Sequence, residues 1–190
     1  MIHNLATRVD AQEVPDEDII ARVMRGDKEQ FRVLISRHKE KVRNLVYLTI
    51  GSAESVDDLS QEVFIKVFRK LDRFKGESKF TTWLYRITVN HCKDELRKRN
   101  VRKVFEMFDR TKHEDLRSTN GAEHFETKER VRLALAKLPE KLRTPIVLKD
   151  IEGFGYNEIA EMLGCELGTV KSRIFRARES LKVMLQPFVE

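Results

Sequence analysis

A chain of 190 residues, 41% apolar and 36% charged, can form one large domain or two small ones, and no apolar run approaches the length of a membrane span. Its two cysteines exclude a disulfide scaffold and match no metal-binding spacing. The formal net charge of +6 favours an anionic partner, most simply nucleic acid. The N-terminus also lacks the apolar core of a signal peptide, so we expect a cytoplasmic protein.

The first predicted module is helical and spans residues 16–100, after a polar tail of residues 1–15. A short helix comes first, and Asp27 with Gln30 three residues later resembles a capping box that opens the second helix. Two more helices follow, on either side of the charged loop 72–79, and each repeats apolar residues at helical spacing. This half is therefore expected to be an all-helical domain.

The helical pattern is lost over residues 101–125, which we interpret as a flexible linker between domains. It returns over residues 126–190, where Pro145 lies inside a helix that begins at Glu140. Because proline removes a backbone donor, that helix is expected to kink or to start late. The predicted fold class is all-α, with two small helical domains joined by a flexible linker.

Residues 156–181 are predicted to form two short helices joined by a tight turn that contains a glycine. At about 100° per residue, Val170, Ile174 and Ala177 face inward and Phe175 faces outward among basic side chains. This pattern predicts a helix-turn-helix whose second helix enters the major groove of DNA. A solvated basic helix or a protein-binding surface are the alternatives. The candidate DNA-contacting residues are Lys171, Ser172, Arg173, Phe175 and Arg176.

An acidic and polar face precedes the loop, with Asp57, Asp58, Gln61, Glu62 and Ile65 at helical spacing. Composition alone indicates an ordinary solvated face, with the first two carboxylates favouring the helix dipole. Neither a histidine nor a third carboxylate joins them at ligand spacing, so we expect no catalytic pair, no metal and no cofactor here.

Aromatic and basic residues alternate after the loop, where Trp83 and Tyr85 lie among lysines and arginines. Such interleaving can bind unstacked bases of single-stranded DNA. Trp83 by itself is better explained as a core residue, but the segment as a whole favours DNA.

Three segments together closely resemble the extracytoplasmic-function group of the bacterial sigma-70 family. They are DDLSQEVFIKVFRKLDRF, KFTTWLYRITVN and LPEKLRTPIVLKDIEGFGYNEIAEMLGCELGTVKSRIFRARESL. The resemblance covers roughly residues 16–100 and 126–185, and both halves match in order. It implies a sigma factor that directs core RNA polymerase to promoters, without catalysis of its own.

The resemblance implies that the first module is sigma region 2. Asp58, Gln61 and Glu62 would then dock on the clamp helices of the polymerase β′ subunit, which replaces the solvated-face interpretation. The loop 72–79 and the helix after it would recognise the −10 element, with Asn90 at the position that contacts a flipped-out base. The implied −10 residues are Lys79, Trp83, Arg86 and Asn90.

The second module would be sigma region 4, whose basic helix recognises the −35 element with Arg173 near phosphates. The linker would run towards the RNA exit path, and the polymerase β subunit would be a further partner. Control by an anti-sigma factor and a role in a stress response are typical of the group. The resemblance implies neither membrane insertion nor an obligate homo-oligomer, and places the protein at the nucleoid when in holoenzyme.

Two other functions remain open from the residues alone. An ordinary helix-turn-helix regulator would use the C-terminal module to bind DNA without polymerase. A nucleic-acid-processing enzyme would need a metal or nucleophile cluster, and the sequence offers none that we could identify.

Overall fold

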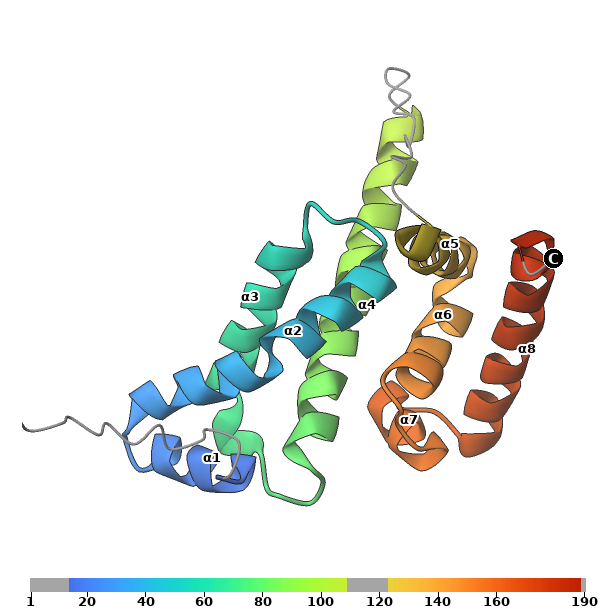
Figure 1. Cartoon of the computed structure of the whole chain (residues 1–190). Helices are drawn as coiled ribbons and strands as arrows, with labels where there is room; N and C mark the ends of the chain where they lie inside the picture. Colours follow the sequence, from blue (N-terminus) through green and yellow to red (C-terminus); the bar gives the residue numbers. More distant parts are fainter. Residues whose placement is uncertain (1–13, 109–122, 189–190) are drawn as a thin grey trace, which may run out of the picture.

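The computed structural model describes residues 14–108 and 123–188, and these are helical with no strand in either range. Figure 1 shows two helical bundles side by side. The all-α fold class is thus confirmed, while the expected tail and linker fall largely outside the described residues. The first bundle contains α1 (Asp16–Met24), α2 (Phe31–Ile50), α3 (Val56–Arg69) and α4 (Phe80–Phe108). The second contains α5 (Glu123–Lys137), α6 (Glu140–Ile146), α7 (Tyr156–Leu163) and α8 (Leu167–Leu185).

The N-terminal bundle has one apolar core built from the inward stripes of its helices. On α3 the stripe consists of Val56, Leu59, Val63 and Val67, all buried on the side that packs against α2 and α4. Burying each such side chain contributes about 1.5–3 kcal/mol relative to leaving it in water. The packing therefore fixes which side of α3 is left for its charged residues.

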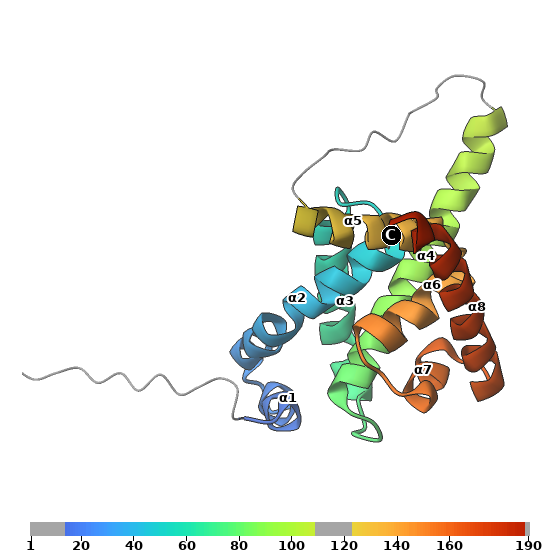
Figure 2. The ribbon, with the colours of Figure 1, turned by 45° about the vertical axis from the view of Figure 1, so that its right-hand side comes forward.

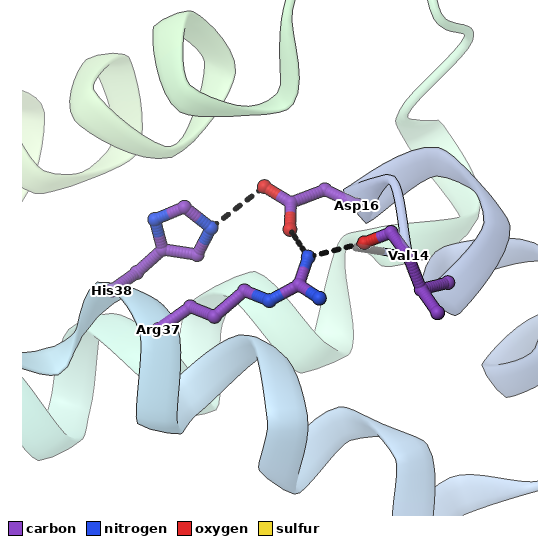
Figure 3. Close-up of polar contacts among 4 residues, drawn as sticks. All are labelled: Val14, Asp16, Arg37 and His38. Atoms are coloured by element: carbon purple, nitrogen blue, oxygen red, sulfur yellow. Dashed lines mark hydrogen bonds and ion pairs between the residues drawn. The ribbon is translucent and has the colours of Figure 1, made fainter. Parts of the chain in front are cut away.

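A polar cluster attaches α1 to α2 (Figure 3). Arg37 Nη1 donates to Asp16 Oδ1 at 2.8 Å and to the Val14 carbonyl at 2.6 Å, while His38 Nε2 lies 2.7 Å from Asp16 Oδ2. Burial by itself raises the pKa of Asp16, but the hydrogen bonds and charges of His38 and Arg37 outweigh it and hold that pKa below its ordinary value. The ionised carboxylate is thus the form that holds α1 in place.

Replacing Asp16 with asparagine is expected to lower the free energy of unfolding by about 1–3 kcal/mol at pH 7. Because the folded pKa is below the ordinary 3.8, the stabilisation is present above about pH 3.8 and is lost as the pH falls through the lowered value. Urea unfolding followed by circular dichroism at several pH values measures both effects. Asp18→Asn, at an exposed position of the same helix, is the control and should change little. Unchanged stability of Asp16→Asn would contradict this role.

The predicted capping box at Asp27 is wrong. A 3-10 turn, Lys28–Gln30, separates Asp27 from α2. No side chain caps the N-terminus of the turn or of α2. The Gln30 amide, which a capping box assigns to the Asp27 side chain, instead donates to the main-chain carbonyl of Asp27 at 3.2 Å. The helical ends around the linker also differ from prediction, because α4 continues past Asn100 to Phe108.

The disturbance expected at Pro145 takes the form of a widened turn. Helix α6 begins at Glu140, includes Pro145 and passes into a π-helical turn, Val147–Ile151, in which the Glu152 amide donates to the Val147 carbonyl at 3.0 Å. A proline inside a helix removes one donor and crowds the preceding turn, which explains the change of hydrogen-bond pattern. The π turn leads directly into Glu152, which contacts the N-terminal bundle.

Candidate nucleic-acid interface

A helix-turn-helix is formed by α7 and α8. The Gly155 amide donates to the Glu158 carboxylate at 2.8 Å where α7 begins, and Gly164 ends the helix with a left-handed φ of 60°. The inward side chains Ile159, Met162, Val170, Ile174 and Ala177 are all buried. Packing of the two helices on this stripe leaves the opposite side of α8 free to face a partner.

The outer side of α8 is basic and carries one exposed aromatic ring. Phe175 is 66% exposed, and Lys171, Ser172 and Arg176 around it are exposed as well, as the helical projection predicts. Arg173 differs, because it is half-buried and its Nη1 lies 3.8 Å from Cys165 Sγ. The side chains that can enter a groove without rearrangement are therefore the exposed ones.

Arg178 lies on the same helix but is already engaged. Its guanidinium donates two hydrogen bonds to the Asp150 carboxylate, at 2.6 and 3.0 Å. These hydrogen bonds, with the charge of Asp150, raise the pKa of Arg178, which keeps it cationic. It belongs to the scaffold that joins α8 to the π turn.

The predicted −10 residues on and before α4 differ in exposure. Lys79 and Asn90 are exposed, and the Arg86 side chain is partly exposed. Trp83 is only 6% exposed, with ring centroids of Phe74 and Phe80 at 5.4 and 5.9 Å. The indole is therefore a core residue with little surface left for a partner.

The polar face of α3 is open to solvent at Asp58, Gln61 and Glu62. Asp57 is exposed as well, but its carboxylate is paired with α2, where it lies 2.9 Å from Arg43 Nε. Phe68, 40% exposed and one turn beyond Ile65, adds apolar surface to this face and was missed from the sequence. Its position three residues after Ile65 was the available signal.

The two bundles contact each other through Glu152. Its carboxylate accepts a hydrogen bond from the Tyr85 hydroxyl at 2.7 Å and another from Asn44 Nδ2 at 2.9 Å. The Tyr85 ring also meets the Phe154 ring edge-on at 4.8 Å. Burial, together with the hydrogen bond and charge of Glu152, raises the pKa of Tyr85, so the hydroxyl stays protonated and donating.

Helix α7 lies beside the N-terminal half of α4 in both views of the ribbon (Figures 1 and 2). Two of its carboxylates reach α4, with Glu161 Oε1 3.5 Å from Arg86 Nη1 and Glu158 Oε1 3.4 Å from the Thr82 hydroxyl. Part of the predicted −10 surface is thus covered by the second bundle. The sequence pattern did not indicate this contact.

An open cleft of about 560 Å³ lies between α4, α6 and α8. Its rim carries more cationic than anionic groups, and apolar side chains such as Val89 and Leu163 line it. The cationic residues that line the cleft are Lys93, Arg97, Lys141 and Arg173. The half-buried position of Arg173 therefore places it between the two bundles rather than on the outer side of α8.

Replacing Glu152 with alanine is expected to weaken the contact between the bundles by about 1–3 kcal/mol, because two hydrogen bonds to a carboxylate are lost. Small-angle scattering should show a larger radius of gyration than for the wild type. Glu161→Ala, which removes only a surface ion pair with Arg86, should have an effect below about 1 kcal/mol. Equal compactness of all three proteins would contradict the role of Glu152.

Metal ligands, apolar spans and thiols were the other features to account for among the described residues, and the structure gives a definite answer for each. Within them, no group of three or more His, Cys, Asp or Glu side chains could hold a metal ion. No helix among the described residues is long and apolar enough to cross a membrane. Both cysteines are free thiols, and burial raises the pKa of Cys92 to about 12.

Each of the two bundles matches a family of known proteins. Residues 34–102 match the family Sigma-70 region 2, and residues 128–181 match Sigma-70, region 4. The RNA polymerase sigma-H factor of Pseudomonas aeruginosa is 36% identical over 184 residues, covering 92% of this chain and 95% of that protein. The ECF RNA polymerase sigma-E factor of Escherichia coli K12 is 36% identical over 189 residues, covering 94% and 98%.

Solved structures are similar over most of the chain. CnrH in complex with the cytosolic domain of CnrY superposes with a TM-score of 0.68 at 26% identity, covering 90% of this chain and 97% of that one. The sigma factor RpoE of Bartonella quintana, in complex with the anti-sigma factor NepR, gives 0.69 at 26% identity, covering 83% and 98%. Both neighbours were solved with a protein partner bound.

Proposed function

Because the chain belongs to the extracytoplasmic-function group of the sigma-70 family, we propose that it binds core RNA polymerase and directs it to promoters through their −10 and −35 elements. The observation that carries this function is the presence of sigma regions 2 and 4, in that order, in one chain with a helix-turn-helix in the second. The protein acts as an initiation factor, with catalysis left to the polymerase, on the chromosome in the cytoplasm.

Each predicted surface takes one partner in this proposal. The exposed face of α3 docks on the β′ clamp helices, the face of α4 binds the −10 element, and α8 binds the −35 element. Exposure of Lys171, Ser172, Phe175 and Arg176 supports base contacts by α8, with Arg173 serving a phosphate once the bundles separate. The order of the two modules along the chain supports their use on two separated promoter elements.

Control by an anti-sigma factor is part of the proposal. The Bartonella RpoE was solved with the anti-sigma factor NepR and CnrH with the cytosolic domain of CnrY, and both align with most of this chain. The covered α4 surface supports a resting form that must open before both promoter elements are bound. A stress signal would act by removing such a partner.

Run-off transcription with purified core polymerase and a promoter library tests the function directly. The chain alone is expected to bind promoter duplex weakly, and core polymerase to make binding tight, because a scaffold that fixes the spacing of two modules raises their effective concentration. Tight and specific binding without polymerase would instead favour the helix-turn-helix regulator.

Arg176→Ala is expected to weaken binding to a cognate −35 site by about 1–3 kcal/mol and to relax base preference there. Holoenzyme binding to a panel of singly mutated −35 sites measures both. Arg178→Ala is the matched control: Arg178 lies on α8 with Arg176, but its guanidinium is held by Asp150 of the π turn, so base preference should stay unchanged. Identical profiles for the two variants would show that Arg176 does not read a base.

A further inference from the structure

A buried histidine lies directly behind the exposed face of α3. His91, on α4, is 3% exposed. Its Nδ1 lies 2.6 Å from Lys66 Nζ, and its Nε2 lies 3.1 Å from Glu62 Oε2. Lys66 and Glu62 are one turn apart on α3, so the imidazole bridges two side chains of the helix that faces the polymerase in the proposed function.

The contact with Lys66 determines where the ring proton lies. An ammonium group can only donate, so Nδ1 must accept and the neutral ring carries its proton on Nε2, on the side of Glu62. The charged groups around the ring are Glu62 and Lys66 from α3 and Asp94 and Lys98 from α4. Burial and the charge of Lys66 lower the pKa of His91, in keeping with a neutral ring.

The Nε2 atom is buried, and it has no aligned hydrogen-bond partner although Glu62 is within 3.1 Å. The Glu62 side chain is 57% exposed, so its carboxylate has room to turn into line with Nε2. An exposed glutamate otherwise loses rotamer freedom when it is immobilised at an interface. If the His91 Nε2–H already holds the Glu62 carboxylate before binding, less side-chain entropy is lost when the interface forms.

We propose that His91 is a positioning residue for core-polymerase binding: its Nε2–H holds the Glu62 carboxylate in the orientation that docks, and Lys66 fixes the ring tautomer. The second carboxylate oxygen of Glu62 remains available to a cationic or hydrogen-bond-donating group of the polymerase. The inference rests on the proposed docking of α3. It also links the helix that meets polymerase to the helix that meets the −10 element.

Affinity of the full-length chain for core polymerase tests this in a double-mutant cycle. His91→Leu keeps a bulky apolar side chain but removes the donor, and it should weaken binding by about 2- to 10-fold. His91→Gln, which restores an N–H near the Nε2 position, should return most of the affinity. In a Glu62→Ala background His91→Leu should have no further effect, whereas a merely structural role would persist there.

Nitrogen shifts of His91 in the unmutated protein give a second measurement that needs no variant to fold. The neutral tautomer protonated at Nε2 supports the inference, and protonation at Nδ1 overturns it. If Glu62→Ala weakens binding but His91→Leu does not, the positioning role fails while the proposed function stands. If the wild-type chain does not bind core polymerase, the proposed function fails and the inference with it.

Discussion

Replacing Asp58, Gln61 and Glu62 together with lysine is expected to lower affinity for core RNA polymerase by at least about 100-fold. All three side chains are exposed on one face of α3, and the reversal sets like charges against any surface that complements the present carboxylates. The apolar stripe of α3 is untouched, so unfolding should remain cooperative, with a change of about 0.5 kcal/mol or less per site. Binding of labelled chain to purified core, alongside thermal unfolding, measures both quantities.

Asp57→Lys is the matched control for this triple variant. It makes the charge change of Asp58→Lys one residue away, at a carboxylate that already pairs with Arg43 of α2. We expect it to lose at most about 1 kcal/mol of stability and to bind core polymerase within a few-fold of the wild type. A triple variant that still co-purifies with polymerase at the wild-type level would remove α3 from the docking surface.

The parts of the fold that could be predicted from sequence depend on local periodicity. The inward stripes of α3 and α8, and the outward position of Phe175, follow from a helical repeat and need no information about distant residues. The capping box at Asp27 failed because a backbone carbonyl took the amide that a side chain was expected to satisfy. The same residues are compatible with a side-chain capping box and with a 3-10 turn closed by a main-chain hydrogen bond, and only the three-dimensional structure distinguishes the two.

Features that depend on contacts between distant segments could not be predicted. Tyr85 and Glu152 are far apart in sequence, and nothing in either neighbourhood indicates a hydrogen bond between them. His91 lies on α4, whereas its polar contacts are with Lys66 and Glu62 of α3, which are distant in sequence. Such pairs form because tertiary packing brings helices together. The periodicity of one helix indicates which side is buried but not which residues of another helix pack against it.

Asn90→Ala is expected to loosen base preference at one position of the −10 element by about 5- to 100-fold and to slow formation of the open complex. Asn90 is exposed on α4, four residues after Arg86 and three before Lys93, so it shares a face with cationic side chains. A carboxamide can both donate to and accept from a base edge. Flipping a base out of the stack costs a few kcal/mol, so a contact made only to the flipped base offsets part of that cost.

Asn100→Ala is the matched control, because it removes the same group from an exposed position of the same helix, ten residues further on and turned to a different side. Holoenzyme binding to single-stranded −10 oligonucleotides that vary one base at a time measures preference, and permanganate footprinting measures opening. Core binding and −35 contacts should persist in both variants, since α3 and α8 are unchanged. If Asn90→Ala keeps the wild-type preference at every position, the flipped base is held elsewhere, and Asn90 is an ordinary surface residue of α4.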